Sequence, residues 1–256
     1  EIVTITTSGD TIQDRPLADI GGKALWTKEL DRCLQDGRTD LSVHSMKDVE
    51  TIRPETLVVA AMLERADPRD RIVGAHSVEA LAQGARVGTS SPRRRAQLLA
   101  RRPDLRIVTM RGNVQTRLAK LDTGEADATL LAAAGLDRIG LGGVGKAVED
   151  MIPAPAQGAV GIEVRADDER VRAMVEAIDH EPTHRCVAAE RAFLAAIGGD
   201  CRSAVAAHAR DGVTTAALKR AGLVVRALSV TSARAASSAW PRLSSSSAVP
   251  RVLTST

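Results

Sequence analysis

The sequence predicts an α/β fold in which short strands alternate with amphipathic helices. Two observations favour this class. Residues 86–132 follow the order strand, helix, strand, helix, strand, which is typical of mainly parallel sheets with buried strands. Residues 40–43 form a further strand that follows a helical pattern. With 256 residues, the chain is long enough to bury a sizeable core.

The first 66 residues alternate strand and helix signals. Residues 2–5 form a short β-branched run, which predicts a strand. A helix follows the pair Gly21-Gly22, its apolar positions fall on one face, and Gly37 ends it. The strand at 40–43 then runs into a polar cluster at 44–48. In open α/β sheets, ligands bind at this carboxyl end of the strands.

The alternation of strands and helices is more regular in the residues that follow. A strand at 86–88 is followed by Ser91 and Pro92, which are typical of a helix N-cap and a first helical position. We expect that helix to reach about residue 101. The remaining elements are strands at 105–110 and 126–132 and helices at 114–121, 168–180 and 182–198.

The two ends of the chain depart from this pattern. The first residue is Glu1 rather than Met and leads straight into a predicted strand, so we expect an N-terminal segment to be missing. Of the last 30 residues, 18 are Ser, Thr or Ala, which predicts little regular structure. We interpret this tail as aberrant, either a linker-like extension or an out-of-frame translation.

Composition excludes several classes of function. No acidic residue follows Asp211, whereas six of the 35 basic residues do, so residues 1–211 carry 29 basic against 32 acidic residues. The mildly acidic body and an aromatic content of 1% argue against nucleic-acid binding. No apolar stretch is long enough to span a membrane. Three cysteines without a secretory signal indicate a reducing compartment, the cytoplasm.

A basic stretch from Arg93 to Lys120 is the strongest chemical signal. Arg93 and Arg94 follow the hydroxyl-rich residues 89–91 at a helix start, where main-chain N–H groups attract anions. Arg111 and Arg117 follow the next strand. Guanidinium groups converging on one cleft suit a ligand with several carboxylates or phosphates. The alternative is an ordinary solvated helix face.

A second cluster combines a carboxylate with cations at a strand end, and its members are Lys23, His44, Ser45, Lys47 and Asp48. Such a carboxylate can act in acid–base catalysis or stabilise a developing positive charge. A surface ion pair is the competing interpretation. No metal-site, P-loop or dinucleotide-binding pattern is present in the sequence.

Cys201 follows two glycines in a predicted loop. An accessible thiol there can serve as a nucleophile or as a covalent anchor. Spacing alone leaves open that this cysteine has no chemical role.

Taken together, these segments resemble the porphobilinogen deaminase (hydroxymethylbilane synthase) family over about residues 1–210. The matching segments are GGK at 21–23, VHSMKDV at 43–49, DPRD at 67–70, VGTSS at 87–91, RGNV at 111–114, TRL at 116–118 and QGAVG at 157–161. Their order along the chain is that of the family.

The resemblance implies a transferase that joins four porphobilinogen units head to tail, releases ammonia and gives hydroxymethylbilane for haem and related tetrapyrroles. It implies a dipyrromethane cofactor attached through Cys201, and a monomer acting in the cytoplasm without nucleic acid or membrane. Asp48 would be the catalytic carboxylate that stabilises the charge formed when ammonia leaves. Cofactor-binding residues would be Cys201, Lys47, Ser45, Ser90, Ser91, Arg93 and Arg94. Substrate-binding residues would be Lys23, Arg111, Arg117, Arg138 and Gln157, with no metal.

The family fold implies two periplasmic-binding-protein-like domains with parallel-rich sheets and a cleft between them, plus a small α/β third domain, here incomplete. Domain 1 would comprise 1–66 and 157–178, domain 2 would comprise 69–152, and domain 3 would comprise 180–256, poorly structured after about 212. The alternatives are a non-enzymatic carboxylate- or anion-binding module of the periplasmic type and an inactive deaminase fragment. We expect the altered ends to make the chain unstable or inactive.

Overall fold

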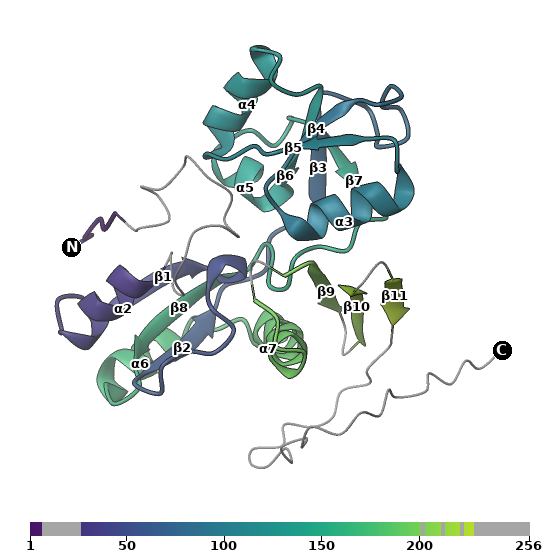
Figure 1. Ribbon diagram of the computed structural model, residues 1–256. Helices are drawn as coiled ribbons and strands as arrows, with labels where there is room; N and C mark the ends of the chain where they lie inside the picture. Colours follow the sequence, from purple (N-terminus) through teal and green to yellow (C-terminus); the bar gives the residue numbers. More distant parts are fainter. Residues whose placement is uncertain (7–26, 201–202, 211–212, 221–222, 228–256) are drawn as a thin grey trace.

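The computed structural model describes residues 1–6, 27–200, 203–210, 213–220 and 223–227. Within these residues, strands form three separate sheets, and helices pack against them (Figure 1). The predicted α/β class is therefore confirmed.

The first sheet has three strands in the order β1–β8–β2, and both of its strand pairs are antiparallel. Its strands and the helices beside it are β1 (Leu41–Ser45), β2 (Leu57–Met62), β8 (Val160–Arg165), α2 (Lys28–Gln35) and α6 (Glu169–Glu176). The sequence predicts parallel-rich sheets, but β8 arrives from far along the chain and runs against both neighbours. One strand inserted in this way makes the described part of the sheet antiparallel.

The second sheet has five strands in the order β5–β4–β6–β3–β7. Its elements are β3 (Asp70–Val73), β4 (Arg86–Gly88), β5 (Arg106–Val108), β6 (Ala128–Ala132), β7 (Lys146–Val148), α3 (Pro92–Arg101), α4 (Val114–Asp122) and α5 (Ala133–Arg138). β5, β4 and β6 are parallel, as the strand–helix alternation predicts. β3 is antiparallel to both β6 and β7, so the sheet is mixed.

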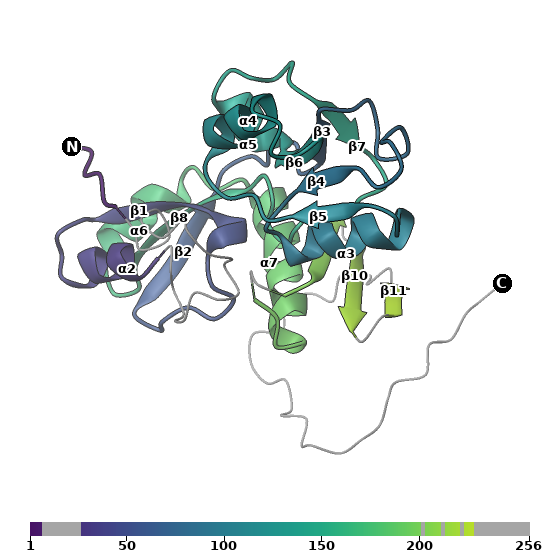
Figure 2. The same ribbon diagram turned by 45° about the horizontal axis from the view of Figure 1, so that its top comes forward.

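The third sheet is antiparallel, in the order β11–β10–β9, and the long helix α7 lies beside β9 (Figures 1 and 2). These elements are α7 (Glu181–Ala196), β9 (Val205–Arg210), β10 (Val213–Arg220) and β11 (Leu223–Ala227). Although composition predicts little structure after about residue 212, β10 and β11 are strands. The sequence between β9 and β10 is Asp211-Gly212, a dipeptide that is common in hairpin turns. Residues 228–256 lie outside the described part.

Two connections cross between the first and second sheets, one from β2 to β3 and one from β7 to β8 (Figure 1). They contact each other directly, because the Ala66 main-chain N–H donates to the Gly158 carbonyl at 3.2 Å. Gly158 has φ of +88°, and a Cβ there would lie 2.5 Å from the Ala66 carbonyl oxygen. Only glycine fits this close approach of two backbones.

The strand predicted at residues 2–5 is absent from the structure. Residues 1–6 have no regular secondary structure, and the Ile2 side chain is 94% exposed. No strand in the described part pairs with this run, and β-branched residues alone do not hold a strand without a partner. Among the described helices, none is both long and apolar enough to cross a membrane.

Candidate active site

Arg93 and Arg94 lie in the first turn of α3, where the local sequence begins the helix. Ser91 is the N-cap, its hydroxyl accepts a hydrogen bond from the main-chain N–H of Arg94 at 3.4 Å, and Pro92 opens the helix. Both arginine side chains are buried. Cations at a helix N-terminus are disfavoured by the helix dipole, so this pair requires a carboxylate nearby.

Asp70, the first residue of β3, supplies that carboxylate. It accepts hydrogen bonds from Arg93 Nη2 at 2.8 Å, from Arg94 Nη2 at 2.7 Å and from Gln157 Nε2 at 2.9 Å. Burial alone would raise the pKa of Asp70, but the charges of the two arginines and their hydrogen bonds outweigh it and hold the pKa well below its usual value. Asp70 therefore stays ionised and joins α3 to the β7–β8 connection.

Asp48 lies at the end of the short 3₁₀ helix η2 (Met46–Asp48), which directly follows β1. Its charge acts on Arg117, a residue of α4 in the second sheet's layer of helices. Burial, and then the charges of Arg94 and Arg111, lower the pKa of Arg117 to about 10, while Asp48 opposes this shift. Asp48, Arg94 and Arg111 therefore each lie near enough to Arg117 for their charges to act on it.

Lys47 connects this group to Asp70. Burial lowers its pKa, and the charges of Arg94 and Arg93 lower it further, whereas Asp48 and Asp70 act in the opposite direction. The Lys47 side chain is half-buried by its accessible surface. The charge of Lys47 therefore interacts with both Asp48 and Asp70.

Among the described residues, the interacting side chains carry more positive than negative charge. The cations are Lys47, Arg93, Arg94, Arg111 and Arg117. The carboxylates whose charges act on them are Asp48 and Asp70. The charges of Arg94 and Arg111 lower the pKa of Arg117, and those of Arg93 and Arg94 lower the pKa of Lys47, because like charges disfavour the charged form. A ligand that carries several carboxylates relieves this repulsion, and planar guanidinium groups bind carboxylates with two parallel hydrogen bonds. The residues present therefore fit an acid-rich ligand such as a dipyrromethane with acetate and propionate side chains.

Comparison with known proteins identifies the family. Residues 1–173 match the family model described as porphobilinogen deaminase, dipyromethane cofactor binding domain. The porphobilinogen deaminase of Sphingopyxis alaskensis (strain DSM 13593 / LMG 18877 / RB2256) is 60% identical over 223 residues, which cover 83% of this chain and 71% of that protein. The chain belongs to the porphobilinogen deaminase family. The predicted class of enzyme, a transferase that makes hydroxymethylbilane in tetrapyrrole biosynthesis, is confirmed.

A second deaminase, from Caulobacter sp. (strain K31), is 52% identical over 219 residues, covering 83% of this chain and 69% of that protein. Among solved structures, the chain is similar to the second substrate binding domain of a putative amino acid ABC transporter from Streptococcus pneumoniae Canada MDR_19A. That match has a TM-score of 0.41 and 19% identity, and covers 66% of this chain and 72% of the other.

Several predicted site residues of this deaminase are engaged with its own backbone. The Ser90 hydroxyl donates to the Met110 carbonyl at 3.0 Å, and Ser91 caps α3. Arg138 Nη2 donates to the Gly158 carbonyl at 2.9 Å, and Gln157 Nε2 donates to the Pro68 carbonyl at 2.7 Å. These contacts place the four residues at the domain connections and at the start of α3.

Three predicted site residues, Ser45, Lys23 and Cys201, remain to be placed. Ser45 is exposed at the end of β1. Lys23 and Cys201 lie outside the described residues.

Several buried ion pairs that the sequence did not predict join segments that lie far apart in the chain. Arg65 makes two hydrogen bonds to Glu190 on α7, at 2.7 and 3.1 Å. Arg53 binds Glu163 with two hydrogen bonds of 2.8 Å, and the Nε2 atom of His44 lies 3.1 Å from the same carboxylate. The partners in these pairs are more than 100 residues apart, so spacing gives no signal for them.

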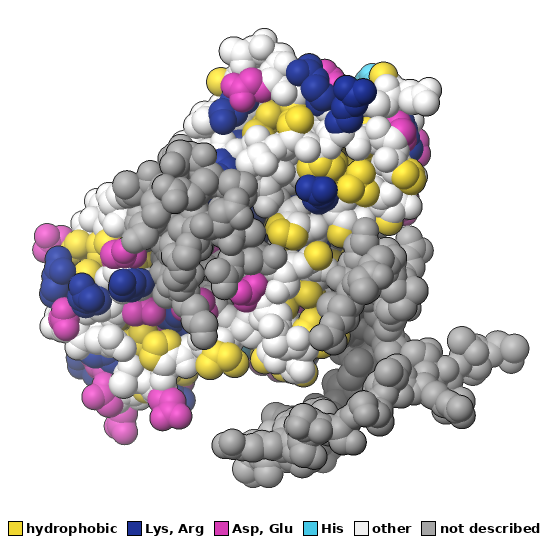
Figure 3. Space-filling model, in the orientation of Figure 1, with side chains coloured by type: hydrophobic (Ala, Val, Ile, Leu, Met, Phe, Trp, Pro, Cys, Tyr) yellow, Lys and Arg dark blue, Asp and Glu magenta, His cyan; other side chains and the backbone are white. Residues whose placement is uncertain are grey.

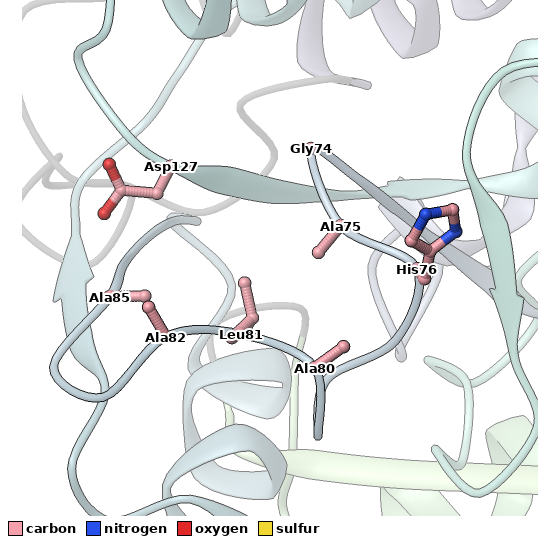
Figure 4. Close-up of a pocket in the computed structure, with 8 residues that line it drawn as sticks. All are labelled: Gly74, Ala75, His76, Ala80, Leu81, Ala82, Ala85 and Asp127. Atoms are coloured by element: carbon pink, nitrogen blue, oxygen red, sulfur yellow. The ribbon is translucent and has the colours of Figure 1, made fainter.

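A small cavity of about 350 Å³ lies away from this cluster, at the β3 end of the second sheet (Figure 4). Its lining is mostly Ala and Gly, with His76 and Asp127 as the polar members. Asp127 is already paired with Arg86 at 2.8 Å. The cavity offers no convergent polar groups, so the Asp48 cluster remains the candidate active site. Among the described residues, no group of His, Cys, Asp and Glu is arranged to hold a metal ion.

Proposed function

We propose that this chain joins four porphobilinogen units head to tail with loss of ammonia, and that Asp48 is its catalytic carboxylate. The single observation that carries the proposal is that the charge of Asp48 acts on Arg117, a residue of another sheet unit on which the charges of Arg94 and Arg111 also act. One carboxylate among many cations suits a substrate that is acidic at its side chains and becomes cationic at its ring.

The arginines bind the substrate's acid groups. Porphobilinogen carries one acetate and one propionate, and each added unit brings two more carboxylates. Hydrogen bonds to charged groups contribute about 1.5–3 kcal/mol each. We assign Arg111 and Arg117 to the acid groups of the substrate, and Arg94 and Lys47 to the acid groups of the cofactor. Asp70 and main-chain carbonyls accept hydrogen bonds from Arg93 Nη1 and Nη2 and from Gln157 Nε2, which holds these two side chains in place.

Asp48 acts on the reacting ring. When ammonia leaves porphobilinogen, the pyrrole ring and its exocyclic carbon acquire positive charge. A fixed carboxylate beside the pyrrole N–H stabilises that charge, because it needs little reorganisation in a site shielded from water. The same carboxylate can then accept a proton after the neighbouring pyrrole attacks.

The dipyrromethane cofactor supplies the primer to which new units are added. We propose that it is attached through the Cys201 thiol, as the family resemblance implies, with Lys47, Ser45, Ser90, Ser91, Arg93 and Arg94 on the cofactor side. Lys23, Arg111, Arg117, Arg138 and Gln157 form the substrate side of the same proposal. We also propose the division into domains at 1–66 with 157–178, 69–152 and 180–256.

The partner in this proposal is a small molecule. On the face shown in Figure 3, Lys and Arg side chains of the unit that carries α2 and α6 are interspersed with Asp and Glu. A nucleic-acid-binding surface requires a continuous positive band instead. We therefore propose a cytoplasmic monomer that acts on porphobilinogen.

Intact-mass spectrometry and turnover together test the proposal. We expect the purified chain to carry an added mass equal to two linked pyrrole units, and Cys201→Ala to lack it. Asp48→Asn should lower kcat by about 10²–10⁴-fold, whereas Glu176→Gln, which removes an exposed carboxylate on α6, should not change kcat. An unmodified wild-type mass together with retained porphobilinogen binding would favour the carboxylate-binding module instead.

A further inference from the structure

Arg191 on α7 binds the backbone that follows Asp48. Its Nη1 donates to the Val49 carbonyl at 3.2 Å, and its Nη2 donates to the carbonyls of Glu50 at 2.5 Å and Thr51 at 3.2 Å. Within the described residues, the hydrogen bonds of Arg191 thus go to three successive main-chain carbonyls. One side chain from the third part of the chain therefore fixes the segment directly after the catalytic carboxylate.

These carbonyls need an external donor. The 3₁₀ helix η2 ends at Asp48, and Val49 is already extended, with φ of −83° and ψ of 136°. No helix or strand covers residues 49–56, so their carbonyls have no regular ladder to join. Val49 is buried, and a buried carbonyl without a partner is costly. A guanidinium group satisfies several such carbonyls at a helix end.

A second contact joins the same segment to the turn after α7. The Thr51 hydroxyl donates to the Gly199 carbonyl at 2.9 Å. Gly199 packs closely against the helix, because a Cβ there would lie 2.6 Å from Leu194 Cδ1. Gly199 is two residues before Cys201, the proposed site of cofactor attachment.

α7 thus holds two segments at once, the one after Asp48 and the one before Cys201. Figures 1 and 2 both show the helix beside the connection from β1 to β2. We propose that Arg191 is a positioning residue that fixes Asp48 relative to α7 and to the turn at residues 197–199 that follows this helix. This inference rests on the proposed function, in which Asp48 is the catalytic carboxylate.

The role that we propose for Arg191 differs from that of the neighbouring Glu190, which attaches α7 to the rest of the structure. Glu190, at the neighbouring position of α7, links the helix to both domain connections, because it pairs with Arg65 and accepts from the main-chain N–H of Ala156. It also accepts from the N–H of Ala209 in β9. Arg191 touches neither connection in these contacts. Its loss should therefore disturb the Asp48 segment and leave the attachment of α7 intact.

The test compares Arg191→Gln and Arg191→Lys with Arg185→Gln in the full-length holoprotein. Arg185 is the matched control, because it lies on the same helix and pairs with Glu181 on the exposed surface. We expect Arg191→Gln to lower kcat by about 10- to 100-fold, the effect of displacing a catalytic group by about 1 Å. KM for porphobilinogen should change less than threefold, because the residues assigned to its carboxylates are untouched. Arg191→Lys, which keeps a cation with three donors, should recover part of kcat.

Hydrogen exchange supplies a readout independent of turnover. Amides of residues 46–52 should exchange faster in Arg191→Gln, while those of β9 keep their wild-type rates. Thr51→Val should give a smaller change of the same kind, and Thr51→Ser should behave as wild type. If Arg191→Gln does not fold, the Thr51 pair and Arg191→Lys still decide the question.

Three results would overturn the inference. The first is an unchanged kcat in Arg191→Gln, and the second is an exchange increase spread evenly over the whole chain. The third is loss of the cofactor mass from the variant, since Arg191 would then serve attachment rather than Asp48. Failure of the proposed function itself is recognised separately, because Asp48→Asn would then retain full turnover.

Discussion

Replacing Asp70 by Asn should strongly destabilise the protein. The Asp70 side chain is 0% exposed and accepts hydrogen bonds from Arg93, Arg94 and Gln157. An asparagine keeps the size and one acceptor oxygen, but its NH₂ group would face a guanidinium donor. Arg93, whose pKa burial already lowers, would lose its carboxylate partner while staying buried.

The size of the destabilisation follows from the buried arginines, which lose their carboxylate partner. Breaking a buried ion pair by removing one partner costs about 3–5 kcal/mol, because the other charge is left without compensation. Whole domains are stable by only about 5–15 kcal/mol. The variant should therefore lose a large share of its stability although only one atom of the side chain differs. Glu176→Gln on α6, an exposed pair with Arg172, is the control and should cost less than about 1 kcal/mol.

Urea unfolding followed by far-UV circular dichroism measures both variants. The pKa of Asp70 lies below its unfolded value, so its contribution is fully present above about pH 4 and is lost only as the pH falls further. The difference between wild type and Asp70→Asn should thus be equal at pH 7 and pH 5. A cost no larger than that of Glu176→Gln would refute the reasoning.

Two further predictions test other parts of the fold. Burial raises the pKa of Glu163, but hydrogen bonds with His44 and Arg53 outweigh it and lower the pKa to about 2. The extra stability of wild type over Glu163→Gln should therefore be present above pH 4.5 and decline as the pH falls from 4.5 to 2, and a pH-independent difference in urea unfolding would contradict this. Gly158→Ala should lower the thermal midpoint more than Gly37→Ala, since both have positive φ but only position 158 meets backbone atoms; equal shifts would show that the contact between the two connections is unimportant.

Local patterns predicted most of the second sheet unit. The helix α3 begins at Pro92 with Ser91 as its cap, and the order of β4, β5 and β6 follows the strand–helix alternation. Capping and periodicity are properties of neighbouring residues, so the sequence displays them directly. The antiparallel partners β3 and β8 were missed, because strand direction in those pairs depends on where a distant segment returns.

The sequence contains an indirect signal for the buried carboxylate of Asp70. It belongs to the DPRD segment used for the family resemblance, yet the sequence analysis gave it no role. The missed signal is the pair Arg93-Arg94 in the first turn of a helix, where the helix dipole opposes positive charge. Two cations at that position predict a buried acidic partner elsewhere, although spacing does not say which Asp or Glu supplies it.

The arginines of this chain look alike in sequence but perform two different tasks. Arg53 and Arg65 are paired with carboxylates at 2.8 Å and 2.7 Å, and these pairs hold segments together. Arg117 donates instead to the Gly112 carbonyl, and burial and neighbouring cations lower its pKa to about 10. It is still protonated near pH 7, but at a cost in repulsion. A bound carboxylate would offset the repulsion that Arg117 experiences from the neighbouring cations. Its binding would therefore raise the pKa of Arg117, and the relief of this repulsion would add to the affinity for the carboxylate. We therefore expect the acidic substrate to bind at Arg117, whose charge no carboxylate hydrogen bond offsets among the contacts of the described residues.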